Sequence, residues 1–176
     1  MISARSTALI VGLLAVALFG VLATRDSGPD RISAHLVSQP APPLAGVSIA
    51  GDEWDLDAQR GRWVVVNFFS TTCVPCIVEH KELVAFSEDH PNDVRVVSVA
   101  FDDAARSVEE FFRTQGGDWP VLAAKTGHIV VDWGVVAVPE SYLVSPSGYV
   151  AAKVVGGIER DALEALLTEL SGTISS

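Results

Sequence analysis

The chain has 176 residues, of which 49% are hydrophobic and 19% charged, and its net charge is -10. This composition suffices for one domain with a hydrophobic core, so the two cysteines are not needed to hold a small fold together. The acidic balance, without any cluster of Lys and Arg, excludes a nucleic-acid partner from our expectations.

The first segment of the chain is strongly apolar. After Arg5, an uncharged run extends from Thr7 to Thr24, which is about the minimum length that spans a bilayer. We expect residues 1–24 to be a retained signal anchor, with a cleaved signal peptide as the alternative. No cysteine follows the run, which excludes a lipoprotein anchor. Either way the protein lies outside the cytoplasm, as a single-pass protein of the cell membrane or as a secreted or periplasmic one.

Residues 25–43 are rich in Pro, Ser and small residues and predict a linker. The folded domain is expected over residues 44–172. It begins with a short hairpin over residues 46–56, followed by a continuous β-branched and aromatic run from Arg62 to Ser70. That run is typical of a central strand buried on both faces.

Strand and helix patterns then alternate along the domain. The pattern from Cys73 to His90 is helical, while the segment from Trp119 to Ala124 is ambiguous. Further elements are predicted as a buried strand over 94–101, a helix over 104–117, a short helix over 127–135, two strands around a Pro-Ser-Gly turn over 140–157, and a final helix over 159–170. This order predicts an α/β domain in which helices flank a mixed central sheet.

Both cysteines lie where the predicted central strand meets the following helix. Cys73 is then expected at the helix N-terminus, where unpaired N–H groups and the helix dipole favour a thiolate. Pro75 is tolerated in the first turn of a helix. Cys76, one turn into the helix, is expected to be shielded. This asymmetry suits disulfide exchange, in which Cys73 attacks and Cys76 resolves the mixed disulfide.

Two other readings of the cysteine pair are less favourable. A zinc site needs four ligands, and Cys73, Cys76 and His80 would need Glu79 as the fourth because no other cysteine exists. A purely structural disulfide that closes so short a loop stabilises a fold little. We therefore expect a redox pair, with no metal and no cofactor.

The segments "NFFSTTCVPCIVEH", "AVPESYLV" and "SPSGYV" together resemble a known family. They are similar to the thioredoxin-like TlpA/ResA/CcmG (DsbE) proteins, which are tethered outside the bacterial cytoplasm and associated with cytochrome c maturation. The resemblance covers roughly residues 42–172. It implies a thioredoxin-like fold and thiol:disulfide oxidoreductase activity.

The resemblance also implies roles for individual residues. Cys73 matches the nucleophile and Cys76 the resolving thiol. Pro139 matches the cis-proline that lies against the disulfide, and Val138 before it would present its backbone to a bound substrate. Glu79 matches an acidic position, and partly buried it would relay a proton to or from Cys76.

Three further positions bear on the site. Ordinary thioredoxins carry a buried aspartate where this chain has Asn67, and since an amide cannot titrate, Glu79 is the expected proton acceptor. Glu140, after Pro139, matches a second acidic position that would tune the site or select partners, with a plain surface residue as the alternative. Thr72 stands where many family members have Trp, so the mouth of the site lacks an aromatic flank, and partner recognition should differ.

The predicted function is thiol:disulfide exchange with protein thiol/disulfide substrates, and the resemblance implies a dedicated reductant. The resemblance points to the paired cysteines of apocytochrome c, with electrons supplied by a membrane electron-transfer partner. The direction of exchange is open, and an oxidant that forms disulfides in secreted proteins is the main alternative. Less favoured are a copper or haem chaperone and a peroxidase. Peroxiredoxins resemble a pattern with Thr at the position of Ser70 and a proline before it, which this chain lacks.

Overall fold

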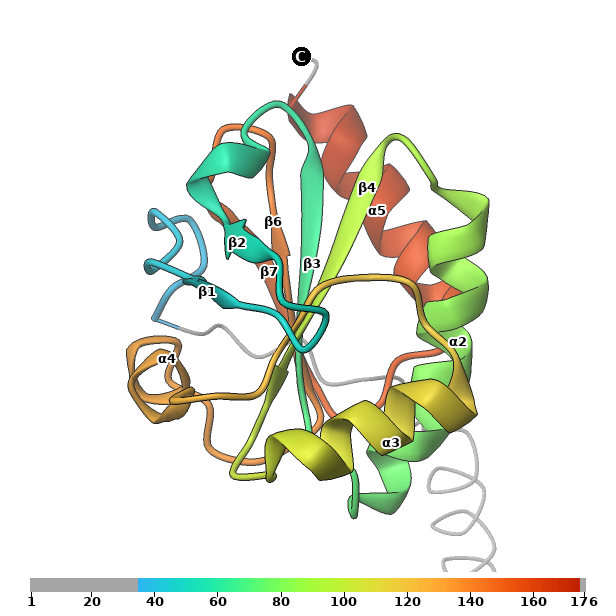
Figure 1. Cartoon of the computed structure of the whole chain (residues 1–176). Helices are drawn as coiled ribbons and strands as arrows, with labels where there is room; N and C mark the ends of the chain where they lie inside the picture. Colours follow the sequence, from blue (N-terminus) through green and yellow to red (C-terminus); the bar gives the residue numbers. More distant parts are fainter. Residues whose placement is uncertain (1–34, 175–176) are drawn as a thin grey trace, which may run out of the picture.

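Five strands form the central sheet of the computed structural model, which describes residues 35–174 (Figure 1). Their spatial order is β5-β4-β3-β6-β7, with β3, β4 and β5 parallel and β6 and β7 antiparallel to their neighbours. The strands are β3 (Trp63–Phe69), β4 (Val94–Ala100), β5 (Val121–Leu122), β6 (Glu140–Val144) and β7 (Val150–Val155). The sheet is therefore mixed, as the order of the predicted elements implies.

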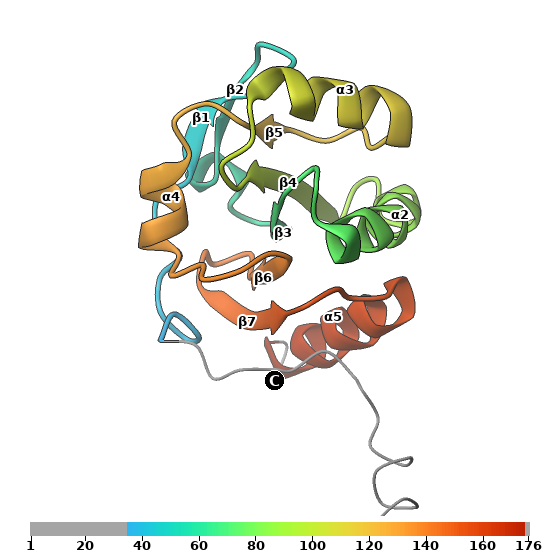
Figure 2. The same ribbon diagram turned by 90° about the horizontal axis from the view of Figure 1, so that it is seen from below.

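Helices cover both faces of this sheet. Figure 2 looks along the sheet and places α2 and α5 on one face, with α4 and the β1–β2 hairpin on the other. The helices are α2 (Val74–Asp89), α3 (Ala105–Gln115), α4 (Gly127–Asp132) and α5 (Arg160–Ile174), and the hairpin strands are β1 (Ala45–Val47) and β2 (Glu53–Asp55), followed by the 3-10 helix η1 (Asp57–Gln59). Because both faces are covered, the central strands β3, β4 and β6 are buried along almost their whole length.

Helix α3 and strand β5 follow β4 and extend the helix-covered face of the sheet toward its edge. Helix α3 buries Val108, Phe111 and Phe112 against Phe69 of β3, on the face that α2 also covers. The helix ends where Gly116 adopts a φ of 83° and donates its N–H to the carbonyl of Phe112. Because positive φ suits glycine, this residue allows the chain to turn back toward the edge strand β5.

Most predicted elements are confirmed with small shifts of their ends. The helix expected from Cys73 begins at Val74, with Cys73 as its N-cap residue. The ambiguous segment contains the two-residue strand β5, which the tertiary pairing with β4 selects. Residues 36–41, which precede the predicted domain start, lie against β7 through hydrogen bonds of Ser38 and Gln39 with Val150.

The predicted anchor over residues 1–24 lies outside the described residues. Within residues 35–174, no helix combines the length and the apolar character needed to cross a bilayer.

Candidate active site

The two cysteines form a disulfide at the start of α2, with their Cα atoms 5.2 Å apart. Cys73 has extended backbone angles and caps the helix, and the N–H of Cys76 points to the Cys73 sulfur at 3.2 Å. Pro75 occupies the first turn, where a backbone N–H has no helical partner. When the bond is reduced, this N–H and the helix dipole stabilise a Cys73 thiolate.

The two sulfurs differ in their access to solvent. Cys73 is half-buried, whereas Cys76 is only 2% exposed. Two apolar side chains close in sequence to the site stand in water, since Val74 is 70% and Val136 84% exposed. Cys73 is therefore the cysteine of the pair that is more accessible from solvent.

The loop before β6 lies against the disulfide. The peptide bond between Val138 and Pro139 is cis, as the family resemblance implies. The carbonyl oxygen of Val138 lies 3.5 Å from the Cys73 sulfur. Val138 thus presents its backbone carbonyl group beside the Cys73 sulfur.

Glu79 is buried one turn after Cys76 and is 2% exposed. Its Oε2 accepts a hydrogen bond of 3.0 Å from the amide of Asn67, and its Oε1 accepts one of 3.3 Å from the N–H of Ile158. Burial raises the pKa of Glu79 to about 7, although the hydrogen bonds from Ile158 and Asn67 oppose this shift. A carboxyl group with this pKa can both take and return a proton at neutral pH.

Glu140 lies on the opposite face of the sheet, and its side chain is not on the surface. It is 3% exposed and forms an ion pair of 2.9 Å with Lys153 of β7. The Lys153 ammonium lies 5.1 Å from the ring centre of Tyr142 and donates to the carbonyl of Gly134. The Glu140 carboxylate can therefore affect the disulfide only indirectly, by fixing the position of the Val138–Pro139 backbone that precedes it.

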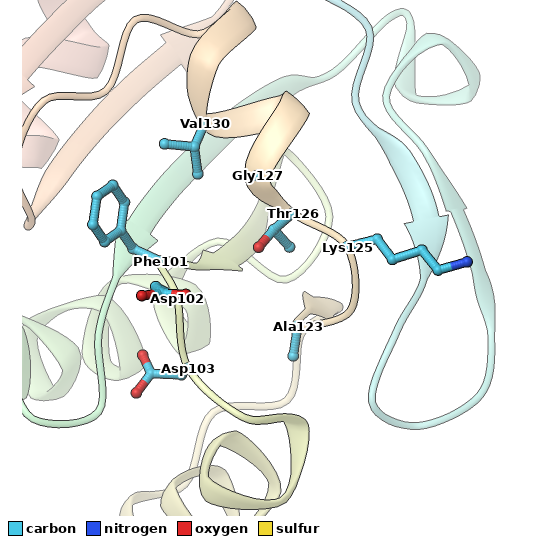
Figure 3. A pocket seen from close by; sticks show the side chains of 8 residues that line it. All are labelled: Phe101, Asp102, Asp103, Ala123, Lys125, Thr126, Gly127 and Val130. Carbon is cyan, nitrogen blue, oxygen red and sulfur yellow. The ribbon is translucent and has the colours of Figure 1, made fainter.

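The segment before Cys73 has one hydrogen bond within itself and two to Asp103, in the loop after β4. Thr72 is exposed, and its hydroxyl lies 3.2 Å from that of Ser70. Thr71 donates both its N–H and its hydroxyl to the carboxylate of Asp103, at 3.1 and 2.6 Å. Asp103 in turn lines a cavity of about 440 Å³ together with Phe101 and Val130, between the end of β4 and the start of α4 (Figure 3).

His80 does not join the cysteines. Its ring is 4% exposed, contacts Phe111, Phe112 and Trp119, and lies 2.9 Å from the carbonyl oxygen of Gly116. Burial lowers the pKa of His80, so the imidazole is neutral at pH 7. Within residues 35–174, no group of three or more His, Cys, Asp or Glu side chains is placed to hold a metal ion.

Sequence reasoning missed three contributors to this site. Ser98 and Ser141 lie beside Asn67, and Asp103 holds Thr71. A serine inside the apolar run of β4 is a usable signal, since a buried polar side chain needs a partner. Asp103 follows a strand in a loop and carries no such signal.

This fold, with a disulfide at the start of a helix that follows a buried strand, defines a thioredoxin-like thiol:disulfide oxidoreductase. The sequence of residues 37–153 matches the model of the AhpC/TSA family, and the chain belongs to this family.

Named relatives agree with that assignment. The chain is 26% identical to the thiol:disulfide interchange protein HelX of Rhodobacter capsulatus over 147 aligned residues. The alignment covers 82% of this chain and 82% of HelX. It is 29% identical over 175 residues to a thiol:disulfide interchange protein DsbE homolog of Paracoccus denitrificans, covering 93% of this chain and 95% of that one. The crystal structure of a thiol:disulfide interchange protein from Chlorobium tepidum has the same fold, with a TM-score of 0.70 at 23% identity over 79% of this chain and 99% of that one.

Proposed function

We propose that this protein is an extracytoplasmic reductant that keeps the paired cysteines of apocytochrome c reduced for haem attachment. Residues 1–24 would tether it to the membrane, or direct its export if they are cleaved. A membrane electron-transfer partner would return it to the dithiol form. The observation that carries this proposal is the asymmetric pair of sulfurs, with Cys73 partly exposed at a helix N-terminus and Cys76 buried on the same helix, three residues before the buried Glu79.

The reaction follows from this geometry. The Cys73 thiolate attacks one sulfur of the substrate disulfide, the substrate S–S bond breaks, and the released substrate sulfur takes a proton. Cys76 then transfers its proton to the Glu79 carboxylate and attacks the Cys73 sulfur, which releases the second substrate sulfur. Two electrons pass to the substrate, and the protein is left with its Cys73–Cys76 disulfide.

Substrate contacts would come from the exposed rim of the site. The backbone of Val138 offers hydrogen-bonding groups to an extended segment, and Pro139 fixes the course of that loop. Thr72 contributes a small polar side chain next to Cys73, in place of a large aromatic one. Glu140 would influence the partner through the position of this loop, because its own carboxylate is buried.

The reduction potential of the full chain tests the direction of exchange. Equilibration against defined thiol buffers, followed by alkylation of free Cys73, gives this value. We expect roughly -220 mV or lower, in the range of thioredoxin and glutaredoxins. A value near about -120 mV, as for strong oxidants, would replace the reductant by the disulfide-forming alternative.

The role of Glu79 is tested by Glu79→Gln. We expect the rate of mixed-disulfide resolution at pH 7 to fall roughly 100-fold or more, because Cys76 loses its proton acceptor. The rise of this rate through about pH 7 should also disappear, since the carboxyl group that titrates there is gone. Stopped-flow measurement of resolution between pH 5 and 9 gives both results.

Glu88→Gln is the matched control, because Glu88 is an exposed carboxylate on the same helix. Its pH–rate profile should equal that of the wild type. A wild-type profile in Glu79→Gln would remove Glu79 from the mechanism while leaving the exchange reaction of the two cysteines intact.

A peroxidase is the second candidate, because this scaffold is shared with peroxiredoxins. Peroxide consumption by the reduced protein should stay at background. Consumption that depends on Cys73 would favour the peroxidase instead.

A further inference from the structure

Three buried polar side chains form a row across the middle of the sheet, on the face that α2 and α5 cover. Asn67 of β3 lies directly opposite Ser98 of β4 on one side and Ser141 of β6 on the other. Their exposed fractions are 3%, 1% and 0%. Because paired residues of neighbouring strands point to the same face, the three side chains point the same way.

This row separates two apolar clusters on the same face. One cluster contains Val65 and Leu143 with the inner sides of α2 and α5, and the other contains Phe69 and Cys76 with α3. Polar groups in such surroundings are costly unless each has a hydrogen-bond partner. Each side chain of the row is therefore expected to have a hydrogen-bond partner. The pattern of these hydrogen bonds fixes which way the Asn67 amide is oriented.

The hydrogen bonds of the row run in one direction. The indole N–H of Trp119 donates to Ser98 Oγ at 2.9 Å. The Ser98 hydroxyl donates to Asn67 Oδ1 at 3.5 Å, which is the longest of these four hydrogen bonds. The Asn67 amide then donates one hydrogen to Glu79 Oε2 at 3.0 Å and the other to Ser141 Oγ at 3.1 Å. An indole nitrogen can only donate, so Trp119 fixes the direction at its source.

The orientation of the Asn67 amide decides whether its nitrogen or its oxygen lies next to the Glu79 carboxyl group. In the structure, the amide N–H points at this group and favours the charged carboxylate. If the amide turned over, its carbonyl oxygen would face Glu79 and favour the protonated acid instead. Ser98 is the only residue in the row that donates to Asn67 Oδ1, so it selects between these two arrangements.

We propose that Ser98 and Trp119 are positioning residues for the redox site, which fix the Asn67 amide so that it donates to the carboxyl group of Glu79, three residues after Cys76 on α2. This inference rests on the proposed function in one respect, namely that Glu79 exchanges a proton with Cys76. Neither residue touches the sulfurs or a substrate. They act across two strands, through Asn67.

Few other charged groups face Glu79 from the surrounding elements. On α2, the neighbouring His80 is turned toward Gly116 and α3. From the loop between β7 and α5, the backbone N–H of Ile158 donates to Glu79 Oε1. The ion pair of Glu140 and Lys153 lies on the opposite face of the sheet. The hydrogen-bonded row and Ile158 are thus the polar partners of this carboxyl group.

The test follows the titration of the Glu79 carboxyl carbon by NMR in the full-length oxidised protein. In Ser98→Ala we expect the midpoint to rise by roughly one pH unit, the size of losing one hydrogen bond to a charged group. Ser98→Thr keeps the hydroxyl and should restore the wild-type midpoint. Trp119→Phe keeps the aromatic packing but removes the donor, and should shift the midpoint in the same direction by less.

Ser87→Ala is the matched control, because the Ser87 hydroxyl bonds only to a carbonyl of α2 and has no link to the row. Its Glu79 midpoint should equal that of the wild type. An unchanged midpoint in both Ser98→Ala and Trp119→Phe overturns the proposal, whatever the exchange rates are. A shifted midpoint in Ser98→Ala, together with a wild-type exchange rate in Glu79→Gln, would support the positioning role and reject only the proton transfer.

Discussion

Glu79 and His80 are consecutive residues of α2, yet their side chains have different surroundings, and only Glu79 is hydrogen-bonded to the polar row of the sheet. Glu79 accepts a hydrogen bond from Asn67 of the polar row, and His80 packs against the aromatic rings of α3 and the loop that follows it. Burial acts on both, and it disfavours the charged form of each. It therefore raises the pKa of the carboxyl group and lowers that of the imidazole.

Asp103 illustrates a residue whose role depends on a contact between distant loops. It accepts two hydrogen bonds from Thr71, which stands two residues before Cys73. We expect Asp103→Ala to lower the free energy of unfolding of the oxidised protein by about 1–2 kcal/mol, because it leaves two donors without their acceptor. Guanidinium denaturation measures this loss.

Thr71→Val provides the partner variant for a double-mutant cycle. The coupling energy between the two positions should be about 1 kcal/mol, since the shared hydroxyl–carboxylate bond is lost in either single variant. Strictly additive effects would mean that this bond contributes nothing to the stability of the loop before Cys73.

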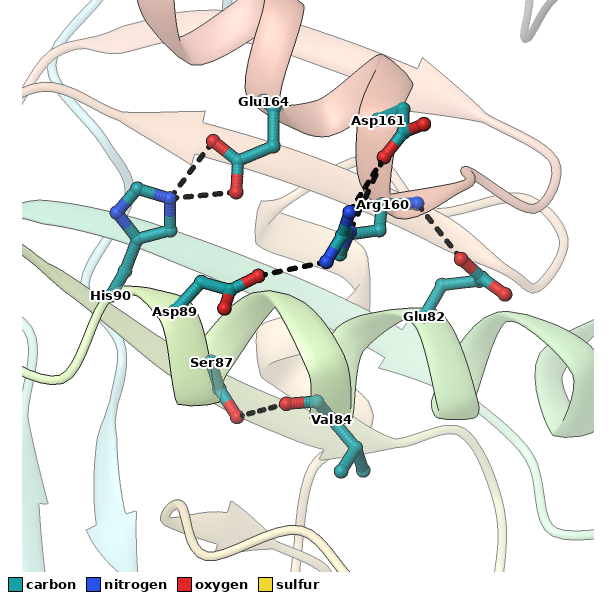
Figure 4. Close-up of polar contacts among 8 residues, drawn as sticks. All are labelled: Glu82, Val84, Ser87, Asp89, His90, Arg160, Asp161 and Glu164. Carbon is teal, nitrogen blue, oxygen red and sulfur yellow. Dashed lines mark hydrogen bonds and ion pairs between the residues drawn. The ribbon is translucent and has the colours of Figure 1, made fainter.

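Among the elements, α2 and α5 are joined by both polar and apolar contacts. Arg160 at the start of α5 pairs with Asp89 at 3.0 Å, and His90 after α2 lies 2.8 Å from a carboxylate oxygen of Glu164 (Figure 4). Between the helices, the side chain of Leu163 is 1% exposed.

The two kinds of contact should contribute unequally to stability. Arg160→Ala is expected to cost less than about 1 kcal/mol, because the Arg160 side chain is 43% exposed and water screens its ion pairs. Leu163→Ala should cost about 2–5 kcal/mol, because it leaves a cavity between packed surfaces. Urea titrations of both variants decide the comparison, and equal losses would contradict it.

The elements that the sequence predicts best are those whose pattern is continuous. The run from Arg62 to Ser70 and the helix that follows it need no tertiary information, because apolar continuity and the turn at the cysteines mark them. The strand β5 is only two residues long, and it exists because β4 offers it a partner edge. A contact of that kind leaves no periodic signal in the chain.

At the scale of the whole molecule, the residues of the site also fall into those that a local sequence motif predicts and those that only tertiary contacts bring together. Cys73, Cys76, Glu79 and Pro139 lie in short motifs with fixed spacing, and the structure gathers the first three at the start of α2, with the Val138–Pro139 loop against the Cys73 sulfur. The polar row joins strands that are far apart in sequence, so its pairing depends on strand register. Glu140 also shows this limit, because its position after Pro139 did not indicate whether it would face solvent or Lys153.

The pH dependence of global stability follows from Glu79 and His80 together. Glu79 binds a proton more tightly in the folded state, with a pKa of about 7 against 4.5, so its contribution is full below pH 4.5 and is lost as the pH rises to about 7. The loss amounts to roughly 3 kcal/mol at most. His80 binds a proton less tightly in the folded state, so stability is lost as the pH falls below 6.5.

Between pH 4.5 and 6.5 these two contributions oppose each other, which predicts a shallow profile for the wild type. Glu79→Gln removes the loss on the alkaline side, so its stability should rise with pH across this window relative to the wild type. His80→Gln removes the loss on the acid side, and its stability should fall with pH over the same range. Denaturant unfolding of the oxidised proteins at several pH values measures these slopes. Parallel profiles for the wild type and Glu79→Gln would show that the carboxyl group has the same proton affinity in the folded and unfolded chain.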